Sequence, residues 1–123
     1  MMTKYDLMID DWVFNTFNKQ PERVFGINEL GVMLYYNDIY DLDEIEPILL
    51  TPKILDKNGF VSYSTGVAPI LGITYPECSI VLAYMNDYWQ ITVDSIVYKI
   101  KIKYVHEFQH TLKLLNIKNE VIL

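Results

Sequence analysis

The sequence predicts a single α+β domain in which antiparallel strands come first and a packed helix comes near the C-terminus. Three observations lead to this class. The 123 residues match one ordinary domain. Short strand-like runs separated by turn residues fill most of the chain. Helical spacing of the apolar residues appears clearly only after residue 104. Within the domain, residues 1–123, we expect a β-rich part over roughly 5–48 and an αβββα part over 49–123.

Composition narrows the classes of function. Hydrophobic residues make up 51% of the chain and charged residues 21%, which excludes disorder. The net charge of −6 argues against a nucleic-acid partner, because such proteins concentrate positive charge. The lone Cys78 excludes an internal disulfide and favours a reducing cytoplasm. We expect no membrane partner, since no apolar stretch has the length of a span.

The first part of the β-rich region predicts a hairpin. Residues 7–17 alternate loosely around two aromatic residues. Strand-like runs over 23–27 and 32–36 are joined by 28–31, which has the composition of a hairpin loop. Short strands at this spacing predict either a small antiparallel β-sheet or an SH3-like barrel.

Acidic residues gather between positions 38 and 46. A calcium loop needs acids at alternating positions and a central glycine, and this segment has neither the register nor the glycine. We therefore interpret it as a solvated acidic loop. The acids are Asp38, Asp41, Asp43, Glu44 and Glu46.

A short helix over 51–57 follows. Thr51 has the side chain of a helix N-cap, and Pro52 stands where its missing N–H has no cost. Asn58 and Gly59 supply the left-handed residue that ends a helix. Ile54 and Leu55 then point inward.

Nineteen uncharged residues separate Lys57 from Glu77. They show no clean period, so we expect some strand and much apolar loop. A span this apolar lies at a subunit contact of a homo-oligomer or lines the binding site, unless it is a strand pair buried in the core. The residues assigned to such an interface are Val67, Ile70, Leu71, Ile73 and Tyr75.

Three strands and a helix complete the pattern. Strands over 79–85 and 88–93 are followed by one that begins at Ile96, with Ile96, Tyr98, Ile100 and Ile102 expected on a buried face. Residues 104–115 have helical spacing, and 120–123 fit a short edge strand. Lysines occupy the other face of the third strand and are first a solvated surface. As an anion site, the candidate residues are Lys99, Lys101, Lys103, Arg23 and Tyr98.

The predicted helix carries a literal H-E-x-x-H, formed by His106, Glu107 and His110. In zinc peptidases the two histidines bind the metal and the glutamate acts as general base. On a helical wheel, however, both histidines lie more than about 100° from the apolar stripe centred near Phe108 and Leu112. We interpret them as two surface histidines.

A third metal ligand is also missing from the motif. The extended form needs Gly where Lys113 stands and His where Asn116 stands. A third ligand would have to be an upstream acid such as Glu77 or Asp87. We therefore expect no metal and no other cofactor, with a minimal zinc metallopeptidase as the alternative.

Two segments of the chain match recognisable patterns. Residues 45–60 resemble the segment I-x-P-I-P-L-T-x-E-I-L-x-K-x-G-F, and residues 104–109 are similar to a C-terminal Y-V-H-x-L-Q-N helix. Both patterns belong to a group of small uncharacterised proteins of Bacteroides-type gut bacteria and their phages, which the chain therefore resembles. Residues 7–13 resemble the group's opening L-R-I-G-N-x-V less closely, and 61–95 match poorly. The group has Asn at the place of His110, so the resemblance does not imply a zinc pair.

The resemblance implies a phage or prophage origin and no defined activity. We therefore expect a small non-enzymatic accessory binding protein, acidic and self-associating. It would counteract host defence by binding a host protein or a nucleotide signal. A structural virion or replication accessory is the other job that such an origin suggests.

Overall fold

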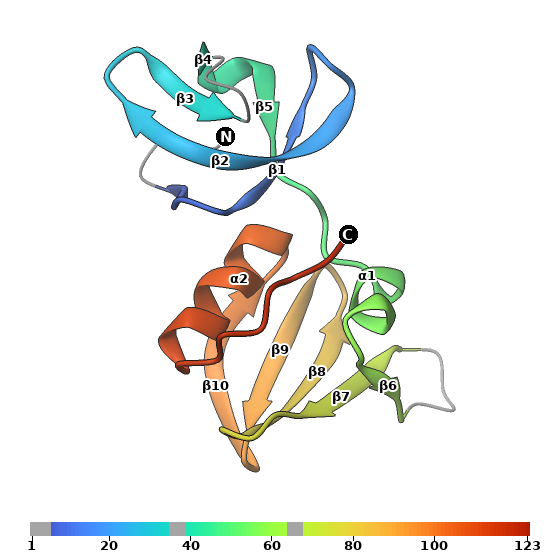
Figure 1. Cartoon of the computed structure of the whole chain (residues 1–123). Coiled ribbons are helices and arrows are strands. Elements are labelled where there is room, and N and C mark those ends of the chain that lie inside the picture. The colour runs from blue at the N-terminus through green and yellow to red at the C-terminus, as the bar shows by residue number, and fades with distance from the viewer. Residues whose placement is uncertain (1–5, 35–38, 64–67) are drawn as a thin grey trace. The chain divides into compact units, whose positions relative to one another are not determined.

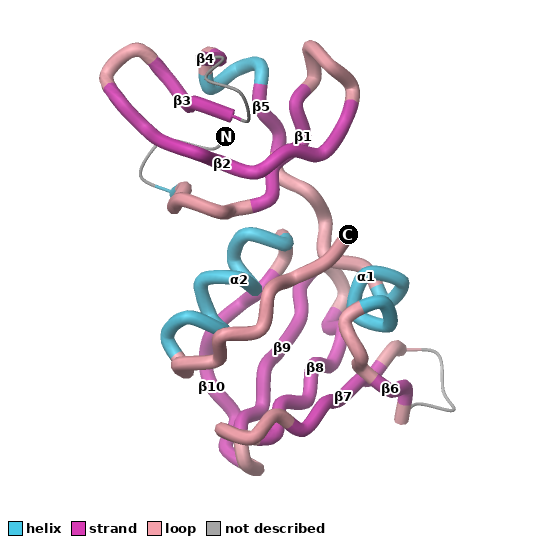
Figure 2. The backbone as a smooth tube through the Cα atoms, in the orientation of Figure 1, coloured by secondary structure: helices cyan, strands magenta, loops and turns pink. Residues whose placement is uncertain are grey.

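The computed structural model describes residues 6–34, 39–63 and 68–123 and confirms the α+β class. The chain divides into two compact units. Unit 1 is formed by Met1–Leu49 with Tyr104–His110, and unit 2 by Leu50–Lys103 with Thr111–Leu123. Each unit contains its own five-stranded antiparallel sheet (Figures 1 and 2). That the chain forms one domain stays a prediction.

The sheet of unit 1 has the strand order β4-β3-β2-β1-β5. β4 and β5 are its two edges and are not paired with each other, so the sheet does not close into an SH3-like barrel; the small antiparallel sheet is the alternative that holds. Its strands are β1 (Trp12–Asn15), β2 (Gln20–Asn28), β3 (Gly31–Leu34), β4 (Ile39–Tyr40) and β5 (Ile45–Glu46).

The hairpin predicted between β2 and β3 is confirmed, and its turn is held by one side chain. The Asn28 Oδ1 atom accepts hydrogen bonds from the Leu30 N–H at 2.8 Å and the Gly31 N–H at 3.2 Å. Gly31 has φ +152°, and a Cβ at this position would collide with the Tyr40 carbonyl oxygen, so only glycine fits here. The hydrogen bonds to Asn28 and this glycine together define the turn.

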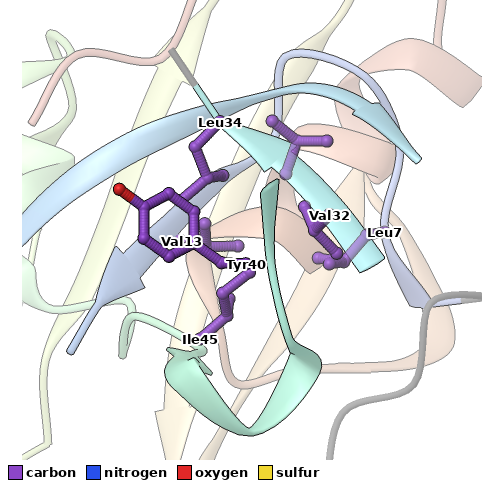
Figure 3. Close-up of a cluster of buried hydrophobic side chains, with 7 residues drawn as sticks. Leu7, Val13, Val32, Leu34, Tyr40 and Ile45 are labelled. Atoms are coloured by element: carbon purple, nitrogen blue, oxygen red, sulfur yellow. The ribbon is translucent and has the colours of Figure 1, made fainter. Parts of the chain in front are cut away.

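The core of unit 1 is made by the alternate residues of its short strands. In β1 and β3 every second side chain is buried, as expected for a sheet with one covered face. These side chains point toward one another in Figure 3. The buried set is Leu7, Val13, Val24, Val32, Leu34, Tyr40 and Ile45.

The segment predicted as a solvated acidic loop is more ordered than expected. Besides β4 and β5 it contains a 3-10 helix, Leu42–Glu44. Tyr40 and Ile45 enter the core of unit 1 and fix the segment at both ends. Asp38 lies outside the described residues. The described acids are solvent-accessible, as predicted, but they are carried by a strand–helix–strand segment, so the loop assignment was wrong.

Unit 2 contains the predicted β-meander. Its sheet has the order β10-β9-β8-β7-β6, with every neighbouring pair antiparallel. The turn residues Asn86, Asp94 and Ser95 all have positive φ, as two-residue hairpin turns require. The strands are β6 (Val61–Ser62), β7 (Ile70–Thr74), β8 (Ser79–Met85), β9 (Tyr88–Val93) and β10 (Ile96–Ile102).

Two helices accompany the sheets. α1 (Pro52–Lys57) begins as predicted, with Thr51 Oγ1 accepting the Ile54 N–H at 3.3 Å, and Gly59 follows it with φ +92°. α2 (Val105–Leu114) starts within the residues of unit 1 and ends within those of unit 2. No described helix is long and apolar enough to cross a membrane.

The C-terminal residues of unit 2 form no strand, contrary to the prediction for 120–123. Their backbone is held by a side chain instead of a neighbouring strand. Asn58 donates from Nδ2 to the Ile122 carbonyl and accepts the Ile122 N–H at Oδ1, both at 2.7 Å. Ile117 and Val121 are buried beside this clamp. The amide of Asn58 therefore takes the place of a paired backbone.

Candidate functional site

An apolar groove opens in unit 2 where β9, β10 and the end of α2 meet (Figure 1). Its volume is about 180 Å³. Every lining residue belongs to unit 2. The surface of the groove is entirely apolar, although Tyr98 and Thr111 carry hydroxyl groups elsewhere on their side chains. The lining residues are Ile91, Val93, Tyr98, Ile100, Thr111, Leu114 and Leu115.

β10 forms the open side of the groove because it is an edge strand. The sequence predicts a half-buried strand, but only Ile102 is buried and residues 96–101 are all exposed. Tyr98 and Ile100 are 40% and 41% exposed, and Leu114 on α2 is 78% exposed. α2 has only ten residues, and the remainder of β10 is left uncovered by the described residues. The prediction of a buried face was therefore wrong for most of the strand.

An irregularity in β10 shapes the same region. Tyr98 pairs with Ile91 while Lys101 pairs with Gln90, so Lys99 and Ile100 are extra residues relative to β9. Such a bulge bends the strand and re-aims its side chains. Ile100 lines the groove, and Lys99 stands next to it in the chain. Lys99 is exposed, so a solvent-accessible cation directly precedes a groove-lining residue in the chain.

The candidate anion-binding residues are divided between the two units. Lys99, Lys101, Lys103 and Tyr98 belong to unit 2, whereas Arg23 lies in β2 of unit 1. The Lys101 ammonium lies 4.9 Å from the centre of the Tyr88 ring, and the Arg23 guanidinium lies 4.9 Å from the centre of the Trp12 ring. Both cations thus stack on aromatic rings of their own unit. No single unit brings the five residues together.

The residues predicted to form an interface fall into two groups. Leu71 and Tyr75 are buried in unit 2, where burial raises the pKa of the Tyr75 hydroxyl, with smaller contributions from Cys78 and Glu77. Ile70 is 37% exposed and Ile73 is half-buried. Val67 lies outside the described residues. The interface itself stays a prediction, and only the exposed members are available to a partner.

The histidines of the H-E-x-x-H are not surface residues, and this prediction was wrong. His106 is 4% exposed. The His110 side chain is 26% exposed, and its Nε2 atom lies 2.6 Å from Oδ2 of the fully buried Asp11. The same carboxylate oxygen accepts the Met8 N–H at 2.7 Å. A buried polar cluster in unit 1 therefore replaces the expected solvated helix face.

Gln109, between the two histidines, ties the helix to the segment before β1. Its Oε1 accepts the Trp12 N–H at 2.8 Å, and its Nε2 donates to the Asp10 carbonyl at 3.0 Å. Glu107 accepts the Tyr104 N–H at 2.9 Å, which caps the helix start. Both side chains therefore satisfy backbone hydrogen-bonding groups. For Glu107, which the motif would make the general base of a peptidase, this is a structural role.

Two buried polar atoms in this cluster lack a hydrogen-bond partner, Asp11 Oδ1 and His106 Nδ1. Burial lowers the pKa of His106, against the opposing effects of Asp11 and Glu107, and so favours the neutral ring. It stacks on the Tyr104 ring with centroids 5.8 Å apart. Within the described part of the chain, no three or more His, Cys, Asp or Glu side chains are placed to hold a metal ion.

Comparison with known proteins adds no relative: no family model, no curated protein and no solved structure matches the chain. The resemblance drawn from the sequence therefore stays a prediction. The groove residues of α2 and β9 were missed as site residues because their apolar side chains fit a core equally well. Leu114 lies outside the apolar stripe centred near Phe108 and Leu112 and is exposed. An apolar residue on the polar face of the helix was the sequence signal that could have indicated this site.

Proposed function

We propose that this chain is a non-enzymatic binding protein and that the groove of unit 2 receives an apolar side chain of a partner protein. The observation that carries this proposal is the groove's open rim. Tyr98, Ile100 and Leu114 stay exposed around a recess whose floor is apolar. Exposed apolar patches next to a concave site are typical of protein interaction sites.

The chemistry of the lining supports a protein partner over a nucleotide. A phosphate-bearing ligand needs several converging hydrogen-bond donors, and the surface of the groove is entirely apolar. An apolar cavity of about 150 Å³ holds a benzene molecule, so a volume of about 180 Å³ accommodates one leucine or phenylalanine side chain. Arg23, one of the candidate anion-binding residues for a nucleotide ligand, belongs to unit 1 and not to the unit that contains the groove.

The biological setting belongs to the proposal as well. The resemblance to gut-bacterial and phage proteins supports a phage or prophage accessory protein acting inside the host cell. In that setting, covering an exposed apolar side chain of a host protein is enough to block that protein's own contacts, and no catalytic group is needed. The aromatic and aliphatic rim is the kind of surface that contributes most to such contacts.

The proposal is tested by photo-crosslinking from the groove. A photoreactive amino acid at position 114 should give discrete cross-linked products in a lysate of the native host. The same amino acid at position 122 is the matched control, because Ile122 is 58% exposed and lies outside the groove lining. Products at 114 that disappear in a Tyr98→Glu variant support the groove. Equal products at both positions, or none at 114, would overturn it.

A further inference from the structure

We propose that the partner of the groove is a second copy of this chain, which inserts Leu30 of its β2–β3 turn and pairs Glu29 with Lys99. This inference rests on the proposed function, because it names the occupant of the same groove. It follows from the charges of the two units, the form of the turn and the rim of the groove.

The two units carry opposite charges. Unit 1 contains 11 acidic and 3 basic residues, a net charge of −8, whereas unit 2 contains 5 acidic and 7 basic residues, a net charge of +2. These add up to the −6 of the whole chain. Unit 2 of one copy therefore attracts unit 1 of another, and complementary potentials of this kind steer association.

The β2–β3 turn of unit 1 has the form of an inserting group. Leu30 is 74% exposed at its tip, and Glu29, also exposed, stands beside it. Asn28 and Gly31 fix the backbone of the turn, as described above. A preorganised turn loses little conformational entropy on binding. Leu30 and the neighbouring Glu29 carboxylate can therefore bind together with only a small entropic penalty.

Another exposed apolar side chain in unit 1 fits less well. Phe17 is 71% exposed at the β1–β2 turn, but its ring packs near the Tyr40 ring, with the two ring centroids 6.2 Å apart. Neither of its neighbours in the chain is charged. Leu30 has an acid as its neighbour, and the groove-lining residue Ile100 has the exposed Lys99 as its neighbour, so the two surfaces are complementary in charge. The Phe17 position therefore serves as the matched control.

Pairing of two β10 strands is disfavoured by the same lysines. An edge strand that carries lysines and a bulge is protected against adding a second strand of its own kind, and β10 carries Lys99, Lys101 and a bulge between Tyr98 and Lys101. The contact therefore joins different surfaces of two copies. Such a head-to-tail contact repeats from copy to copy until it closes a ring or extends as a fibre.

Sedimentation velocity over a concentration series tests the proposal. The wild-type chain should associate reversibly, and less so at high salt. Glu29→Lys, Lys99→Glu and Leu30→Asp should each weaken association by about tenfold or more. Phe17→Asp, as the control, should leave it unchanged. Circular dichroism confirms that each variant remains folded.

Charge exchange decides the pairing. Glu29→Lys and Lys99→Glu should each self-associate more weakly by about tenfold or more, whereas an equimolar mixture should associate as the wild type does. In the mixture the lysine introduced at position 29 of one variant meets the glutamate introduced at position 99 of the other, and the second variant's native Glu29 meets the first variant's native Lys99. A monomeric wild-type chain, or failure of the mixture to associate, would overturn the second-copy occupant. If position 114 still cross-links to a different protein, the binding function stands and only the identity of the partner is wrong. If it gives no products, both proposals fail.

Discussion

Replacing Asp11 by alanine tests the buried polar cluster of unit 1. The Asp11 carboxylate accepts hydrogen bonds from the Met8 N–H at 2.7 Å and from His110 Nε2 at 2.6 Å. Hydrogen bonds to charged groups contribute about 1.5–3 kcal/mol each, and the unpaired Oδ1 costs about 1–3 kcal/mol that the substitution removes. Allowing for the partial exposure of His110, we expect the free energy of unfolding to fall by about 2 kcal/mol.

The assay follows each unit separately through its own tryptophan. The chain has two tryptophans, Trp12 in unit 1 and Trp89 in unit 2. Labelling with 5-fluorotryptophan and recording ¹⁹F NMR spectra through a urea series gives an unfolding curve for each. Asp11→Ala should shift the Trp12 curve to lower urea. In a double-mutant cycle with His110→Ala, the coupling energy should be about 1 kcal/mol.

A Trp12 curve that moves by less than about 0.5 kcal/mol would refute this reasoning, because surface substitutions without structural role have effects of that size. A zero coupling energy would show that the two side chains do not stabilise each other. Asp11→Asn, which keeps the shape and one acceptor oxygen, should cost less than Asp11→Ala. The reverse order would contradict the hydrogen-bond account.

Three further predictions concern single side chains. Thr51→Ala removes the cap that accepts the Ile54 N–H and should cost about 1 kcal/mol in urea unfolding, roughly 0.5–2. Trp89→Phe removes the indole donor to the Leu50 carbonyl, 2.9 Å away and buried, and should cost about 1–3 kcal/mol, visible as faster amide hydrogen exchange in unit 2. Because burial lowers the pKa of His106, the unfolded chain takes up its proton first as the pH falls through the ordinary value of 6.5. Stability should therefore decrease on acidification below that pH, and His106→Asn should flatten the decrease in thermal melts at successive pH values.

Much of the fold could be predicted because its signals are local. The bounds of β8 and β9 follow from apolar alternation between turn residues, and Asn86 adopts the positive φ that its residue type tolerates. The start of α1 follows from Thr51 and Pro52 in the same way. In each case the side chain bonds or constrains a backbone group within a few residues, so the sequence window contains both partners.

The candidate site depends on partners that are far apart in the chain. His110 and Asp11 are separated by 99 positions, and so are Gln109 and Asp10. A helical wheel places the histidines on a polar face but does not contain the carboxylate and backbone groups that cover it. The exposure of β10 could not be predicted from the sequence for a related reason. Whether a strand is central or at an edge is a property of the order of the sheet, and alternation of apolar residues is the same in both.

The composition of unit 1 has a consequence for synthesis on the ribosome. Its five strands are translated first, but Gln109 and His110, which bond to the segment before β1, are added only after the whole of Leu50–Lys103 has been made. At usual translation rates unit 1 therefore has its sheet strands but lacks its helical segment for several seconds. During that interval Asp11 has no histidine partner. Nascent chains stalled before residue 104 should therefore be cut by protease in residues 6–34, and chains stalled well beyond residue 110 should be protected there.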